Sequence, residues 1–308
     1  MKLIFLGTGS GVPSKKRNVS SITLEMLQEL GSIWMFDCGE STQHQILHTN
    51  IRPGKIDKIF ITHLHGDHIY GLPGFISSRS FQGGETPLTI YGPKGIKEYI
   101  ETSLKISGSN LTYQLLYQEV FEGLIEENDK FQVFAKKLDH GIDSFGYRLV
   151  EKDRPGQLQP EKLIQVGIKP GPIFQKIKNN DVVSLDNGQV LHRQDYIGPN
   201  KPGRVICILG DTRYMPGISS FIKDSDVLVH EATFSTDREE LAYQYHHSTT
   251  TQAAKLAYDS NVDRLILTHI SSRYQDEHLS ELLNEARSIF HRSEIAYDLY
   301  EIDIPAKD

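Results

Sequence analysis

Short apolar runs that end in glycine or a polar residue recur along the chain and predict β-strands. The predicted strands cover residues 2–7, 33–39, 58–63, 88–92, 131–140, 204–211, 226–232 and 264–269. Helical periodicity between some of these runs predicts helices over residues 95–104, 235–245, 249–260 and 279–290. Strands interleaved with helices indicate a layered α/β architecture.

One segment, residues 151–199, lacks this clear periodicity and is rich in Pro, Gly, Lys and Gln. We interpret it as a flexible arm inserted in the domain. Its charged residues between 162 and 178 are all lysines: Lys162, Lys169, Lys176 and Lys178. A solvated lysine-rich surface is the simplest explanation, but long segments without clear structure are uncommon in compact domains and are often functional.

Length and charge limit the classes of protein to consider. The 308 residues suit one large domain or two small ones. The formal net charge of -7 gives no global basic field that would attract nucleic acid. Any contact with RNA must come from a local basic patch, and we expect no DNA partner.

The two cysteines and the N-terminus indicate a cytoplasmic protein. Cys38 and Cys207 lie in apolar runs, where core packing is a simpler explanation than metal binding, and two cysteines make no disulfide framework. The first apolar run is too short for a signal peptide. No window approaches the roughly 18 apolar residues of a membrane span.

The run THLHGDH, residues 62–68, concentrates metal-binding chemistry directly after a predicted strand. Four of six consecutive positions there carry such side chains, namely His63, His65, Asp67 and His68. A lone histidine is usually an ordinary surface or core residue, but four such groups buried together would leave several polar atoms unpaired. We expect them to bind two metals, with zinc favoured and manganese or iron as alternatives.

Three further side chains of the same kind follow predicted strands elsewhere in the chain. His140 ends the run FQVFAKKLDH, Asp211 ends RVICILGD and His269 ends RLILTH. Side chains at strand ends sit on loops that a rigid sheet holds in place. These three residues are therefore the expected remaining ligands.

The glycine-rich run at residues 7–11 does not predict a dinucleotide site. Val12 occupies the position where the third glycine of that motif would stand. We interpret the run as a tight turn that carries the basic loop PSKKRN. Lys15, Lys16 and Arg17 of this loop are candidates for contacts with RNA phosphates, with a solvated charge run as the alternative.

These motifs together resemble the metallo-β-lactamase superfamily and, more narrowly, the short form of the ribonuclease Z family. The narrower resemblance depends on PSKKRN, FDCGEST, SRSFQGG, GDT, HEAT and HHST. It implies an αββα sandwich over residues 1–308 with the arm inserted. It also implies a zinc-dependent endoribonuclease that removes 3′ extensions from precursor tRNA and leaves a 3′-hydroxyl after the discriminator nucleotide.

The resemblance also assigns roles to individual residues. It implies two Zn²⁺ ions per subunit, with Asp211 bridging them and Asp67 also acting as general base. The ligands of one metal would be His63, His65 and His140, and those of the other Asp67, His68 and His269.

Hydrolysis also needs a proton donor at the departing oxygen. His247 is our candidate, with Glu231 holding its other ring nitrogen, and the resemblance implies the same pair. Thr249 and Gln252 fit a capping box, which predicts a helix start just after His247.

The resemblance gives the arm a use as a tRNA-binding exosite. A Gly-Pro motif of the family is similar to Gly171 and Pro172. The resemblance further implies a homodimer in which the arm of one subunit serves the site of the other. Recognition would then depend on the shape of tRNA rather than its sequence.

Two other functions are compatible with the same residues. One is a small-molecule hydrolase on this scaffold, such as a phosphodiesterase, an arylsulfatase or a thioesterase. The other is an inactive RNA-binding scaffold, although such proteins lose metal ligands and here all seven candidate ligands are present.

Overall fold

The computed structural model describes residues 1–307, which form two compact units. The core unit comprises residues 1–150 and 205–305, and the arm unit comprises residues 151–204 with the chain end from Ala306. The arm unit therefore extends to Arg204, beyond the boundary at residue 199 expected from the sequence.

Two seven-stranded sheets form the core unit. The first has the order β18 (Tyr300–Asp303), β1 (Lys2–Gly7), β3 (Ser21–Met26), β4 (Ser32–Phe36), β5 (Ile56–Phe60), β6 (Leu88–Gly92) and β7 (Leu115–Glu119). The second has the order β17 (Ser293–Ile295), β15 (Leu265–Thr268), β14 (Val227–Glu231), β13 (Val205–Leu209), β10 (Ser144–Glu151), β9 (Phe131–Leu138) and β8 (Gly123–Glu127). Strands β4 to β7 run parallel to one another, as do β13, β14, β15 and β17.

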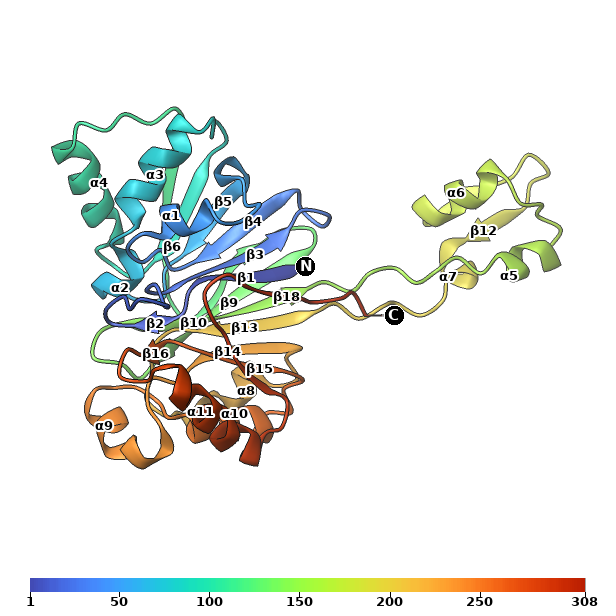
Figure 1. Cartoon of the computed structure of the whole chain (residues 1–308). Helices are drawn as coiled ribbons and strands as arrows, with labels where there is room; N and C mark the ends of the chain where they lie inside the picture. Colours follow the sequence, from blue (N-terminus) through green and yellow to red (C-terminus); the bar gives the residue numbers. More distant parts are fainter. Residues whose placement is uncertain (308) are drawn as a thin grey trace. The chain divides into compact units, whose positions relative to one another are not determined.

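Helices cover the outer faces of both sheets (Figure 1). On the first sheet these are α1 (Thr42–Ile46), α3 (Leu72–Phe81) and α4 (Ile96–Ile106); on the second they are α8 (Ser219–Ile222), α10 (Thr250–Asp259) and α11 (Asp276–Ile289). One apolar cluster lies between the sheets, and one lies beneath each helical layer. The predicted αββα sandwich is confirmed.

Local sequence explains the strands and helices near the site. All four residues of β15 are buried, as expected for a parallel strand covered on both faces. Helix α10 begins at Thr250 with the predicted capping box, in which the Thr249 side chain accepts from the Gln252 backbone and the Gln252 side chain from the Thr249 backbone. The capping box therefore fixes the start of the helix shortly after His247.

Short elements connect the layers at one end of the sandwich. These are α2 (Gly66–Ile69), α9 (Glu239–Gln244) and the parallel pair β2 (Gly9–Ser10) and β16 (Ile270–Ser271). The β2–β16 pair joins the glycine-rich run to the segment that directly follows His269. The predicted tight turn is thus held beside a candidate metal ligand.

The arm unit is folded into short helices and strands, although no clear periodicity in the sequence predicted them. It contains α5 (Pro160–Gln165), α6 (Pro172–Asn179), β11 (Val182–Ser184), β12 (Val190–His192) and α7 (Arg193–Tyr196). Its own apolar core consists of Leu163, Ile177, Val183 and Leu191. The elements are too short for their periodicity to stand out in the sequence. At its base, Arg204 Nε and Nη2 donate to the Glu151 carboxylate at 2.7 and 2.9 Å.

Both cysteines are buried and unpaired, which confirms the prediction of core packing. Burial raises the pKa of Cys38 to about 12 and that of Cys207 to about 11, so neither thiol is activated. Within residues 1–307, none of the helices has the length and apolar character needed to span a membrane.

Candidate metal centre and active site

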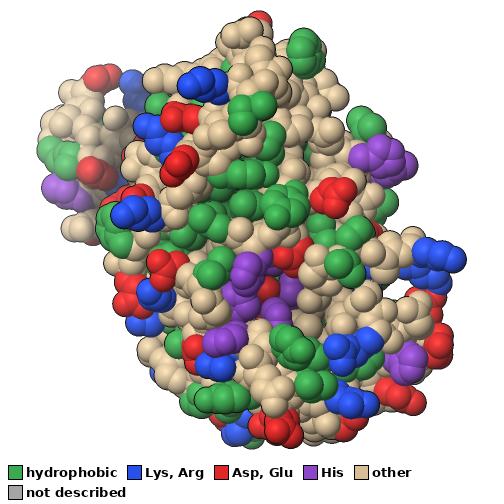
Figure 2. All heavy atoms as spheres, turned by 90° about the vertical axis from the view of Figure 1, so that its left-hand side faces the viewer, with side chains coloured by type: hydrophobic (Ala, Val, Ile, Leu, Met, Phe, Trp, Pro, Cys, Tyr) green, Lys and Arg blue, Asp and Glu red, His purple; other side chains and the backbone are tan. Residues whose placement is uncertain are grey.

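Histidine side chains gather in a hollow on one face of the core unit, with acidic side chains between them (Figure 2). The structure brings together all seven ligands predicted from the sequence. They follow β5, β9, β13 and β15, except that Asp67 and His68 lie on the short helix α2. Strand ends at one edge of the two sheets therefore build the site.

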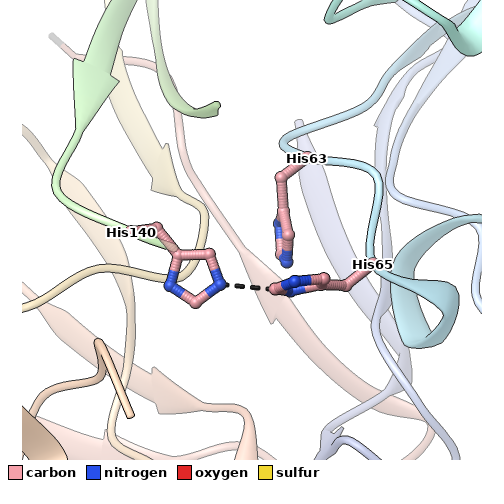
Figure 3. Close-up of side chains that lie close together, drawn as sticks. All are labelled: His63, His65 and His140. Atoms are coloured by element: carbon pink, nitrogen blue, oxygen red, sulfur yellow. Dashed lines mark hydrogen bonds between the residues drawn. The ribbon is translucent and has the colours of Figure 1, made fainter. Parts of the chain in front are cut away.

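Three histidines form the first group of candidate ligands (Figure 3). Their ring nitrogens lie within 4.8 Å of one another, and His140 Nε2 is 3.1 Å from His65 Nδ1. His140 Nδ1 donates to the His246 carbonyl at 2.8 Å, which orients the His140 ring. His63, His65 and His140 are the group that the resemblance implied.

Asp67, His68 and His269 form a second group whose ligand atoms also lie within 4.8 Å of one another. Asp67 Oδ2 is 3.2 Å from His269 Nε2 and 3.5 Å from His68 Nε2. The Gly11 backbone N–H donates to the same oxygen at 2.7 Å. The glycine-rich loop therefore fixes the carboxylate expected to act as general base.

Asp211 lies between the two groups. Its Oδ2 is 3.6 Å from His63 Nε2, 3.5 Å from His68 Nε2 and 3.3 Å from His269 Nε2. One carboxylate oxygen thus faces ligand atoms of both groups, as a bridging residue requires.

The charges of the site fit cation binding. Burial opposes protonation of His68, but Asp211, Asp37 and Asp67 outweigh it and raise the pKa of His68 well above its usual value. Burial also favours a neutral Asp211, yet the surrounding histidines hold the pKa of this carboxyl well below its usual range. The carboxylates therefore attract positive charge, which metal ions would supply in place of protons.

An orphaned atom gives a second indication of the same kind. His63 Nε2 is buried and has no hydrogen-bond partner within residues 1–307. Burial and the nearby His68 keep the pKa of His63 well below its usual value, so its ring is neutral at pH 7. The unprotonated nitrogen of a neutral imidazole can bind a metal ion through its lone pair. The donor set, imidazole and carboxylate, fits zinc, manganese or iron.

His247 and Glu231 form the predicted pair beside this cluster. His247 Nδ1 is 2.9 Å from Glu231 Oε1. Burial opposes protonation of the imidazole, but its interaction with Glu231 prevails and raises the pKa of His247 to about 9. His247 is therefore protonated at neutral pH and can donate a proton.

Sequence reasoning missed Asp37, which organises the site without being in the predicted ligand set. Its Oδ2 is 2.7 Å from His68 Nδ1, and its Oδ1 accepts from the Thr62 backbone at 2.7 Å. Asp37 follows β4 directly and has a φ of 57°, a left-handed conformation that is uncommon for residues other than glycine. Its position after a strand, the criterion used for His140, Asp211 and His269, could have identified it.

The structure corrects one predicted RNA contact in the basic loop. The guanidinium of Arg17 is buried, and its Nη1 donates to Thr8 Oγ1 at 2.7 Å and to the Ala296 carbonyl at 2.6 Å. It holds the loop from inside and cannot meet a phosphate. Lys16 is exposed and pairs with Asp276, while Lys15 is exposed. Lys15 is thus the best placed of the three for RNA.

The candidate RNA-binding residues of the arm unit lie on its surface. Gly171 and Pro172 are exposed, and α6 begins at Pro172. The four lysines are also exposed: Lys162, Lys169, Lys176 and Lys178. These lysine side chains are therefore accessible to a binding partner of the arm unit.

Comparison with known proteins places this site in a family. A family model described as anti-Pycsar protein Apyc1 matches residues 1–139, less than half of the chain. The metallo-beta-lactamase fold protein YhfI from Bacillus subtilis has a TM-score of 0.68 at 17% identity, covering 98% of each chain. At that identity the likeness shows the fold alone, which is the metallo-β-lactamase fold.

Two further comparisons are much more specific. The short form of human tRNase Z is 30% identical with a TM-score of 0.73, covering 99% of this chain and 100% of that one. A ribonuclease Z from Oceanobacillus iheyensis is 59% identical over 306 residues, which are 98% of this chain and 100% of the relative. With such identity over nearly the full length, the chain belongs to the ribonuclease Z family.

Proposed function

We propose that this protein is an endoribonuclease that removes 3′ extensions from precursor tRNA. It cuts after the discriminator nucleotide and leaves a 3′-hydroxyl. The observation that carries the proposal is the convergence of seven ligand side chains beside the His247–Glu231 pair, in a chain 59% identical to a ribonuclease Z. The complete ligand set argues against an inactive RNA-binding scaffold.

Two Zn²⁺ ions would occupy the cluster. His63, His65 and His140 would hold one ion, Asp67, His68 and His269 the other, and Asp211 would contact both. Bound ions of this kind polarise a phosphodiester and supply hydroxide at neutral pH.

The chain's own residues manage the protons. Burial alone would raise the pKa of Asp67, but the neighbouring His68 and His269 lower it far below its usual range. Asp67 is therefore an ionised carboxylate, held by the Gly11 N–H, and it accepts the proton of the attacking water. His247 gives a proton to the departing ribose oxygen, and Glu231 keeps its ring oriented and charged.

The substrate would be held by exposed cations outside this centre. Lys15 and Lys16 would meet phosphates near the cut, and Lys162, Lys169, Lys176 and Lys178 would meet the body of the tRNA. Such contacts are electrostatic and independent of sequence, so salt should weaken binding steeply. A small-molecule hydrolase would have no use for this second set of cations.

We further infer a homodimer in which each arm unit serves the partner's site. Two large apolar side chains support self-association: Leu47 is 65% exposed directly after α1 and Phe81 is 89% exposed at the end of α3. The helices α1 and α3 pack against each other, and contiguous exposed apolar surface marks interaction sites on soluble proteins.

The test of the proposed function is the mapping of cleavage products. A tRNA transcript with a 3′ extension is incubated with wild type, with Asp67→Ala and with a control, Asp303→Ala, whose exposed carboxylate lies on β18. We expect wild type and control to cut at one position after the discriminator, and Asp67→Ala to lose several orders of magnitude in rate. Equal rates in all three proteins would remove the assignment of Asp67, and absence of cleavage by wild type would remove the function.

A further inference from the structure

Two threonines beside the metal ligands make the same set of contacts on opposite sides of the site. We propose that Thr62 and Thr233 are positioning residues that fix the tautomers of His63 and His269, so that Nε2 of each ring is free to bind metal. The proposal concerns the metal centre of the proposed function and rests on it.

The first set of contacts begins at Asp37. Thr62 Oγ1 donates to Asp37 Oδ2 at 2.8 Å, and the Thr62 backbone N–H donates to Asp37 Oδ1 at 2.7 Å. The same hydroxyl oxygen is 3.0 Å from His63 Nδ1. A hydroxyl has a single hydrogen, and here a charged acceptor takes it.

The second set begins at Glu231 and repeats the pattern. Thr233 Oγ1 donates to Glu231 Oε2 at 2.7 Å, and the Thr233 backbone N–H donates to the same oxygen at 3.1 Å. The hydroxyl oxygen is 3.0 Å from His269 Nδ1. The His269 carbonyl also lies 3.1 Å from this hydroxyl, but the carboxylate is closer and charged, so it takes the hydrogen.

The direction of these hydrogen bonds decides the state of each imidazole. Because the threonine hydrogen points to the carboxylate, the hydroxyl oxygen presents a lone pair to Nδ1. Nδ1 must then carry the ring hydrogen, and Nε2 keeps its lone pair. Nε2 of His63 is the orphaned buried atom, and Nε2 of His269 faces Asp211 Oδ2 at 3.3 Å. Both free nitrogens therefore point into the cluster.

Each carboxylate also contacts a second imidazole directly. Asp37 accepts from His68 Nδ1 at 2.7 Å, and Glu231 accepts from His247 Nδ1 at 2.9 Å. One buried carboxylate thus orients two rings, one directly and one through a threonine. Thr62 and Thr233 are only 1% and 3% exposed, so water cannot replace their hydroxyls.

Substitutions can separate the effect of the hydroxyl group from the effect of side-chain shape. Thr62→Val and Thr233→Val remove it, whereas Thr62→Ser and Thr233→Ser retain it. Thr23→Val is the matched control, because Thr23 is fully buried in β3 and its hydroxyl donates to the Ile4 carbonyl at 3.4 Å, away from the metal ligands. Partners of this kind typically change metal affinity by about 10- to 100-fold.

Two measurements on the zinc-loaded enzyme test the proposal. Competition with a chromophoric chelator should give about 10- to 100-fold weaker zinc binding in the valine variants, and near-normal binding in the serine variants and the control. Long-range ¹H–¹⁵N spectra of the imidazoles should show His63 and His269 as Nδ1–H tautomers in wild type. Normal zinc affinity in the valine variants, or an Nε2–H tautomer at either ring, would overturn the proposal.

Neither measurement depends on RNA cleavage. A wild-type enzyme that fails to cut precursor tRNA would remove the proposed function while leaving the tautomers and zinc affinities to be judged on their own. If a valine variant does not fold, an Nε2–H tautomer at either ring of the wild type would still overturn the proposal.

Discussion

At the scale of single residues, the contact between Glu231 and His247 predicts a specific pH dependence. Its effect exceeds that of burial and raises the pKa of His247 to about 9, so the proton donor is charged below that pH and lost above it. Bound cations would lower this pKa. The rate of diester hydrolysis should therefore fall as the pH rises through a value of about 9 or somewhat lower. Replacement of Glu231 by Gln should move the falling limb at least about one pH unit toward acid.

The measurement is the pH profile of kcat/KM on a dinucleotide, a small diester that does not need the arm and whose departing ribose oxygen requires a proton. Glu240→Gln is a suitable control, because Glu240 is an exposed carboxylate on α9. A falling limb at the same pH in Glu231→Gln and in the control would show that another group donates the proton.

The seven candidate metal ligands could be predicted from sequence because each one follows an apolar strand or lies in THLHGDH. Thr62 and Thr233 could not, because their roles depend on the direction of one hydroxyl bond. The burial of Arg17 could not be predicted either: its partner Ala296 lies 279 residues away in sequence, and a basic run gives no indication of which cation points inward.

At the scale of elements, two residues of the basic loop are predicted to have different effects: Arg17 on the stability of the fold and Lys15 on the binding of RNA. Replacement of Arg17 by Ala leaves the Ala296 carbonyl and Thr8 without a donor, so the free energy of unfolding should fall by about 2 kcal/mol. Replacement of the exposed Lys15 by Ala should change stability by less than about 0.5 kcal/mol and should weaken precursor tRNA binding.

Chemical denaturation and filter binding on the two variants provide the measurement. If Arg17→Ala keeps wild-type stability and loses RNA affinity, the assignment of the buried cation as structural is wrong. Most of the parallel strands were predictable because they are apolar runs, but β7 and β17 were missed. The strand Ser144–Glu151 was missed, since SFGYRLVE mixes polar and apolar residues while facing two different layers.

At the scale of the whole molecule, the separate core of the arm unit predicts that it can be removed. Arg154 N donates to the Lys201 carbonyl at 2.9 Å, so residues 155–200 can be replaced by Gly-Gly without stretching the chain. The shortened protein should hydrolyse the small diester at a rate within about twofold of wild type. Cleavage of precursor tRNA should fall by at least about tenfold, the equivalent of 1.4 kcal/mol of lost binding.

Zinc affinity and thermal unfolding of the core unit serve as controls for this deletion. Unchanged cleavage of precursor tRNA would show that the arm lysines do not hold the substrate. The salt dependence of tRNA binding can also be compared between wild type and the shortened protein. The shortened protein should show a shallower dependence, because it makes fewer phosphate contacts.

The proposed hydrolysis depends most on a pair of cations held by side chains from distant parts of the chain. The direct measurement is metal content by mass spectrometry on purified protein that has been loaded with zinc and desalted. We predict two zinc ions per chain in wild type and a clear loss in Asp211→Ala, whose carboxylate faces both ligand groups. Less than one zinc per wild-type chain, with no gain when zinc is added, would contradict the account.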